Sequence, residues 1–176
     1  MSDIIIQDNF LNKEYFKELQ DLVLAGDFTW FRSSIDCIGD PDDYQMCHVV
    51  YAGAPYYEIN SNFYHKLHPF FEKLDLYSLQ RVKINLQQRA EKITEQGMHI
   101  DVNDAPENAL TSILYMNTNN GYTKFENGDK VESVENRLVT FPNNLRHTGS
   151  TNTCDAIYRC VMNIDWIKKL NNGEIK

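Results

Sequence analysis

Apolar and polar residues alternate with a period of two in the second half of the chain, as expected for β-strands that bury one face. The clearest example is the segment 80–88, in which apolar side chains share one face and polar side chains share the other. The polar face consists of Arg81, Lys83, Asn85 and Gln87. In an open sheet this face would meet solvent. In a barrel-like sandwich it would line a pocket, with Asn85 and Gln87 as candidate contacts.

Further strand-like runs follow at nearly regular spacing, with turn residues between them. They lie at 109–117, 122–126, 130–134, 137–141 and 156–166. Asn127-Gly128 separates two of these runs and is the strongest short hairpin signal in the chain. Many short strands with turn signals between them predict an all-β sandwich or barrel.

Helical spacing of apolar residues is confined to the N-terminal half. A helix is predicted over 13–24, after Asn12 as its N-cap, and a second over 57–74, which Pro69 should kink or restart. Short strands are expected at 3–7, 29–32 and 45–51. We therefore expect one domain over 1–176, in which 1–78 form a helical and mixed support and 79–167 form the β-rich core.

Composition narrows the class of protein. With 176 residues and 20.5 kDa, the chain is long enough to bury about 70% of its unfolded surface. It has no apolar run of about 18 residues and no basic stretch before its first apolar residues, so we expect neither a membrane span nor a signal peptide. Its four cysteines lack metal-site spacing, which favours free thiols in the cytoplasm. The net charge of −8 argues against a nucleic-acid partner.

The candidate chemistry begins with His99 and Asp101. In a strand, residues two apart point to the same side, so we expect both side chains to face one site, with a third ligand, His147, supplied by another strand. A single His-x-Asp pair is common by chance, and the distant histidine adds weight to it. Two imidazoles and one carboxylate on one face of a metal, with other positions open, are typical of non-heme Fe(II) oxygenases. The predicted metal site lies in the β-rich core.

Arg159 is a second unusual residue, because it lies inside an apolar run that reads as a buried strand. A buried charge without a partner is costly, so this arginine needs an anion. The planar guanidinium suits a carboxylate bound through two hydrogen bonds.

Together these residues resemble the motif of 2-oxoglutarate/Fe(II)-dependent dioxygenases: His-x-Asp, a distant His, and an Arg about a dozen residues later. Within that superfamily the chain is most similar to the prolyl-4-hydroxylase-like branch, and especially to small members encoded by bacteriophages. The resemblance covers roughly 80–167 and includes the segments 112–117, 121–125 and 141–142. It implies a double-stranded β-helix (jelly roll) with N-terminal helices packed on the outer sheet and the site in its open mouth.

The resemblance also implies a set of ligands and roles. Fe(II), 2-oxoglutarate and O2 would be used, with ascorbate as an accessory reductant, and 2-oxoglutarate would be decarboxylated to succinate as a substrate is hydroxylated. His99, Asp101 and His147 would hold the metal, and Arg159 the far carboxylate of 2-oxoglutarate. Tyr115 matches a position that binds this carboxylate, although an ordinary core tyrosine is the alternative. Two further candidate contacts are Asn163, on the strand face of Arg159, and Thr123, in an element whose first glycine is replaced here by Asn120.

Several alternatives stay open from the sequence. The substrate is a protein side chain or a small molecule, and Tyr44, Tyr51, Tyr56 and Tyr57 are candidates to line its site. A cupin-like Zn or Mn hydrolase or isomerase, or a non-catalytic interaction domain, would use the same fold. The acidic loop 36–43 reads as a solvated turn rather than a cation site. The expected location is the cytoplasm, that of the host for a phage-encoded protein.

Overall fold

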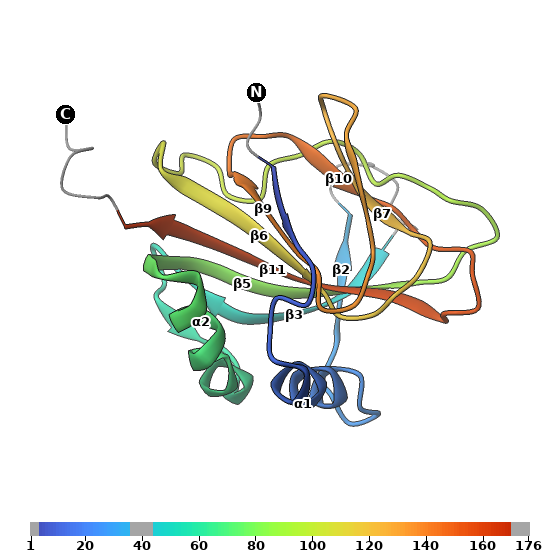
Figure 1. Cartoon of the computed structure of the whole chain (residues 1–176), viewed down its shortest axis with the longest axis horizontal. Coiled ribbons are helices and arrows are strands. Elements are labelled where there is room, and N and C mark those ends of the chain that lie inside the picture. The colour runs from blue at the N-terminus through green and yellow to red at the C-terminus, as the bar shows by residue number, and fades with distance from the viewer. Residues whose placement is uncertain (1–3, 36–43, 170–176) are drawn as a thin grey trace.

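The computed structural model describes residues 4–35 and 44–169, which form two antiparallel β-sheets packed face to face, with helices on the outer side of the larger sheet (Figure 1). The acidic loop 36–43 considered above lies outside the described residues. The fold is the jelly roll that the resemblance implies.

The strand boundaries are close to those expected from the alternating pattern. The strands are β1 (Ile5–Gln7), β2 (Phe31–Ser34), β3 (Tyr44–Ala52), β4 (Glu58–Ile59), β5 (Leu76–Gln88), β6 (Ala109–Tyr115), β7 (Tyr122–Phe125), β8 (Lys130–Glu132), β9 (Leu138–Pro142), β10 (His147–Gly149) and β11 (Tyr158–Lys168). The major sheet has the order β1-β9-β6-β11-β5-β3-β2, with β4 paired to β3, and the minor sheet has the order β10-β7-β8. Residues before 53 therefore supply strands at both edges of the major sheet as well as helical cover.

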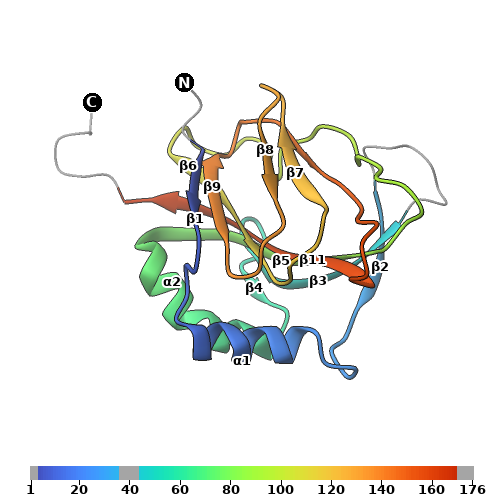
Figure 2. The same cartoon turned by 45° about the vertical axis from the view of Figure 1, so that its right-hand side comes forward.

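The two faces of the major sheet have different partners. Leu114 of β6 and Met162 of β11 are fully buried in one core cluster with residues of α1 (Lys13–Val23), η1 (Asn62–Leu67) and α2 (His68–Leu74). Their neighbours Ile113 and Val161 point to the opposite face and pack in a second cluster with residues of the minor sheet. Figure 2 shows the helices on one side of the major sheet and β7 and β8 on the other.

The helical segments follow the sequence signals except at one boundary. Asn12 caps α1 as predicted, because its side-chain oxygen accepts hydrogen bonds from the backbone N–H groups of Glu14 and Tyr15 at 2.9 and 3.3 Å. The second helix was predicted to start at residue 57, and this is wrong. Residues 58–59 pair with β3, and a 3₁₀ turn comes first. Pro69 lies in the first turn of α2 and restarts the helix there, as expected.

Among the described residues, no helix is long and apolar enough to cross a membrane.

We expect the substitution Asn12→Ala to lower the free energy of unfolding by about 1 kcal/mol, because two N–H groups at the start of α1 lose their acceptor. Urea denaturation followed by circular dichroism measures this. Asn60→Ala is the matched control, since Asn60 is exposed and its side chain makes no hydrogen bond within the described residues. Equal stability of the two variants would contradict the capping role.

Candidate metal centre and ligand cavity

His99 and His147 are brought together by a short piece of backbone pairing. The N–H of each residue donates to the carbonyl of the other at 2.9 Å, and the two imidazole rings lie 4.8 Å apart. This is an isolated bridge, so the expectation that His99 and Asp101 lie in a strand is wrong. The segment lies in the long connection between β5 and β6, next to Gly97, whose positive φ of 88° breaks an extended run.

Both histidines present the same ring nitrogen to the site. The Nδ1 of His99 lies 3.1 Å from the carbonyl of Gly97, and the Nδ1 of His147 lies 3.3 Å from the carbonyl of Leu145. A carbonyl accepts only from a protonated nitrogen, so this contact leaves the Nε2 lone pair free to bind a metal. The Nε2 atoms lie 3.9 Å (His99) and 3.5 Å (His147) from oxygens of Asp101. The ligand atoms of these three residues all lie within 4.8 Å of one another.

The side chain of Asp101 is only 7% exposed and is held by two further side chains. Arg81 forms an ion pair with its Oδ1 at 2.6 Å, and the amide of Asn163 donates to its Oδ2 at 3.1 Å. Burial by itself would raise the pKa of Asp101, but the Arg81 guanidinium outweighs it, and the pKa lies below its usual value. Asp101 is therefore a carboxylate, as a metal ligand must be.

Arg81 also contacts a second buried carboxylate. Its Nε donates to Asp165 at 2.8 Å, and the hydroxyl of Thr111 donates to the same carboxylate at 2.8 Å. Burial, followed by the nearby charge of Asp101, raises the pKa of Asp165. Neither Arg81 nor Asp165 is among the site residues predicted from the sequence. The alternating pattern of the sequence could have indicated both residues. Asp165 lies on the same face of β11 as Arg159 and Asn163, and Arg81 belongs to the polar face of β5.

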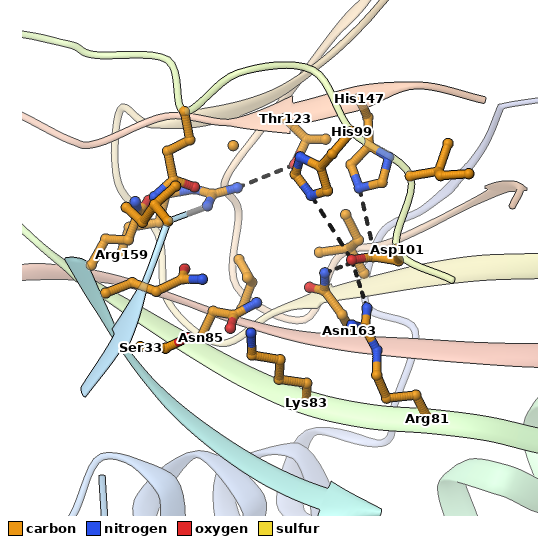
Figure 3. A pocket seen from close by; sticks show the side chains of 18 of the residues that line it. Ser33, Arg81, Lys83, Asn85, His99, Asp101, Thr123, His147, Arg159 and Asn163 are labelled. Carbon is orange, nitrogen blue, oxygen red and sulfur yellow. Dashed lines mark hydrogen bonds and ion pairs between the residues drawn. The ribbon is translucent and has the colours of Figure 1, made fainter. Parts of the chain in front are cut away.

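A cavity of about 380 Å³ opens beside the three candidate ligands, between the two sheets (Figure 3). The polar face of β5 lines it, so the pocket alternative for that face is the correct one. The lining side chains of β5 are Arg81, Lys83, Asn85 and Gln87. The proposed lining tyrosines are not found there: Tyr51, Tyr56 and Tyr57 do not border either described cavity, and Tyr44 borders a neighbouring cavity of about 260 Å³.

Arg159 lies at the other side of the same cavity from the three ligands (Figure 3). It is only 4% exposed, and burial lowers its pKa. Its Nε donates to Ser133 at 2.9 Å and its Nη2 to Thr123 at 3.1 Å. Within residues 4–35 and 44–169, it forms no ion pair with a carboxylate. The guanidinium is thus a buried cation with hydroxyl partners only.

Glycines of the minor-sheet region make room for this arginine. A Cβ at Gly121 would lie 2.7 Å from the Cδ of Arg159, and one at Gly149 would lie 3.2 Å from its Nη1. Side chains at these positions would displace the guanidinium from the cavity wall.

Tyr115 lies behind this wall. It is fully buried, its hydroxyl donates to Thr123 at 2.8 Å, and its ring lies 5.7 Å from the guanidinium of Arg159. It does not border the cavity, whereas Thr123, Asn85 and Asn163 do. Tyr115 therefore positions Thr123 and Arg159 from behind.

No protein-family model and no curated protein sequence matches the chain. Several solved structures share its fold. SnoN, a non-heme epimerase of nogalamycin biosynthesis that depends on α-ketoglutarate (2-oxoglutarate), is 14% identical, with a TM-score of 0.67 over 95% of this chain and 79% of its own. A Pseudomonas putida prolyl-4-hydroxylase is 13% identical, with a TM-score of 0.62 over 97% and 95%. A 2OG-Fe(II) oxygenase-family protein from Burkholderia pseudomallei is 10% identical, with a TM-score of 0.65 over 94% and 86%.

These structural neighbours are 2-oxoglutarate/Fe(II) oxygenases, prolyl hydroxylases among them. At this level of identity, the property that the chain shares with them is the jelly-roll fold.

We expect the protein to bind one divalent ion, and the substitution His147→Ala to weaken that binding by at least about 100-fold, because a direct ligand is lost. Titration calorimetry with Mn²⁺ measures this. His65→Ala is the control, since His65 is exposed and lies outside the cavity. A metal that still binds tightly to the His147 variant would show that these three residues are not its site.

We expect Arg81→Met to destabilise the fold by about 3 kcal/mol, because two buried carboxylates lose their shared cation. The figure is at the low end of the range for buried pairs, since the Arg81 side chain is 25% exposed to the cavity. Saturating Mn²⁺ should raise the melting temperature more in this variant than in the wild type, because a cation at the triad restores a partner to Asp101. Thermal denaturation with and without the ion measures both effects. The exposed Arg89→Met is the control, and a similar loss of stability in it would contradict the prediction.

Proposed function

We propose that this protein is an Fe(II)- and 2-oxoglutarate-dependent oxygenase that couples decarboxylation of 2-oxoglutarate to hydroxylation of a substrate. One observation supports the proposal above the others. Two imidazoles and a carboxylate converge at one side of a cavity whose other side holds a buried guanidinium without a carboxylate partner among the described residues.

The donor set fits a ferrous ion. Two neutral imidazole nitrogens and one carboxylate face the cavity from one side, so the remaining positions of a bound ion would be open to small ligands. The hydrogen bonds from each Nδ1 to a backbone carbonyl fix the rings in the orientation that binding requires. Asn163 restrains the Asp101 carboxylate in the same way.

The Arg159 side of the cavity fits a dicarboxylate. A 2-oxoglutarate molecule that meets the metal with one end would place its far carboxylate toward Arg159. The Nη1 of Arg159 makes no hydrogen bond within the described residues. Gly149 lies in front of it and has no side chain that would block a ligand. A carboxylate there would supply the missing counter-charge of a buried arginine.

In the proposed reaction, one oxygen atom of O2 enters succinate, the other enters a C–H bond of the substrate, and 2-oxoglutarate releases CO2. The bound metal would supply the activation of O2. The residues of this chain would hold 2-oxoglutarate in one orientation and would keep the two imidazoles and the Asp101 carboxylate in place for the metal.

The proposal is distinguished from the alternatives by Arg159. A cupin-like hydrolase or isomerase would need the metal ligands but not a buried guanidinium opposite them. A non-catalytic domain would need neither. An enzyme that binds a dicarboxylate across the cavity accounts for both features.

We expect Arg159→Met to raise the Kd for 2-oxoglutarate by at least about 30-fold, which corresponds to about 2 kcal/mol, because the bound carboxylate loses its charged partner. The Kd is measured anaerobically with Fe(II), from the visible charge-transfer band of the complex. Arg159→Lys, which keeps the charge but not the planar fork, should lie between this variant and the wild type. The exposed Arg89→Met should match the wild type.

Succinate formation in air, with Fe(II) and ascorbate, tests the function itself. We expect slow uncoupled succinate production by the wild type and none by His99→Ala. If Arg159→Met binds 2-oxoglutarate as tightly as the wild type, Arg159 does not bind the co-substrate. The proposed metal centre would not be affected by that result. Absence of both the band and succinate in the wild type would remove the proposed function.

A further inference from the structure

Lys83 is a charged cavity residue to which the proposed function gives no role. It lies on the polar face of β5, and its ammonium group points into the cavity between the three metal ligands and Arg159 (Figure 3). Two other cations line the same space. Arg81 is paired with Asp101 and Asp165, and Arg159 is assigned to 2-oxoglutarate. Among the residues that the structure describes, Lys83 has neither an ion pair nor a hydrogen bond.

The strand register places Lys83 at the metal end of the cavity. Lys83 is directly opposite Asn163 on β11, whose amide holds Asp101, whereas Gln87 is directly opposite Arg159. Lys83 and Gln87 are four residues apart on one strand face, or about 13 Å. A group bound by Lys83 is therefore beside the metal ligands and away from the far carboxylate of 2-oxoglutarate.

Carboxamides of the same cavity lack donors for their oxygens. Gln87 and Asn163 are each only 6% exposed, and their side-chain oxygens are buried without a hydrogen-bond partner, as is that of Asn85. A ligand with N–H or O–H groups would satisfy them. Most other lining side chains are polar, and the aliphatic ones are Ile35, Ile100, Ile113 and Val161.

We infer that the oxidised substrate is a small carboxylic acid that also carries amino or hydroxyl groups, as a free amino acid does, and that Lys83 binds its carboxylate. The inference rests on the proposed function and names the substrate class of that same site. Lys83 holds the carboxylate next to the metal, and the carboxamide oxygens of Asn85 and Asn163 accept from the amino or hydroxyl group. The C–H bond to be hydroxylated then lies between these contacts and the metal.

The test uses the holoenzyme with Fe(II), 2-oxoglutarate and ascorbate in air, and the probes are the twenty free amino acids and their α-amides. The readouts are succinate formation and hydroxylated product, detected by mass spectrometry. We expect at least one free acid to be hydroxylated and to stimulate succinate formation several-fold, and its amide to do so at least about tenfold less. Lys83→Met should lower the stimulation by the acid at least about tenfold, and Lys83→Arg should restore part of it. Lys13→Met, on an exposed helix position outside the cavity, should behave as the wild type.

Three results, besides the absence of any stimulating probe, would overturn the inference. One is an amide that is used as well as its acid. Another is a full response to the acid in Lys83→Met. The third is a tenfold rise in the Kd for 2-oxoglutarate in Lys83→Met, because Lys83 would then hold the metal-bound end of the co-substrate. If the wild type binds 2-oxoglutarate and makes uncoupled succinate but no probe stimulates it, the substrate class is wrong and the proposed function stands. If it does not bind 2-oxoglutarate, the proposed function itself fails.

Discussion

The ion pairs of Arg81 with Asp101 and Asp165 are the interaction on which the centre of this structure depends. The carboxylate of Asp165 on β11 and that of Asp101 in the β5–β6 connection are both buried, and one guanidinium pairs with both. Without that cation, Asp101 would be protonated or drawn toward solvent, since an isolated buried charge is costly. Arg81 thus keeps Asp101 ionised before any metal is present, and a bound cation at the triad would share that carboxylate with it. The ion pair with Arg81 therefore holds the carboxylate ligand in place without help from a metal ion.

The alternating faces of β5 and β11 connect this site to the fold. On each strand, one set of residues packs against the helices and the intervening set faces the cavity, as Met162 and Asn163 illustrate. Because the period is two, a slip of one residue in β5 would move Arg81 and Lys83 into the helix-packed core, and a slip in β11 would move Asn163 there. The hydrophobic packing of the helices therefore fixes the register of the polar face. Stability and chemistry depend on the same pairing.

Local pattern predicted most of the strands, the cap at Asn12 and the pair His99 and Asp101, because these follow from spacing along the chain. It did not predict what depends on the third dimension. The polar face of β5 was ambiguous until the minor sheet was seen to cover it. Asp165 gave no signal by itself, because its role comes from pairing with Arg81 on the neighbouring strand. Residues 98–102 alternate like a strand, but the pairing described there is a single backbone bridge between His99 and His147. One bridge is too little to form a regular strand.

The charge of the cavity is opposite to that of the protein. The chain carries a net charge of −8, yet the charged lining residues are Arg81, Lys83 and Arg159 against Asp101 alone. At physiological ionic strength, charges more than about 8 Å apart in solvent are largely screened, so the acidic surface has little influence on a ligand inside. The local cations, in a partly desolvated space, decide which ligands are held. A cavity with this lining, plus a divalent metal, retains an excess of positive charge after binding one dianion. A second acidic ligand is therefore favoured over a neutral one, and Lys83 is a lining cation without a carboxylate partner among the described residues.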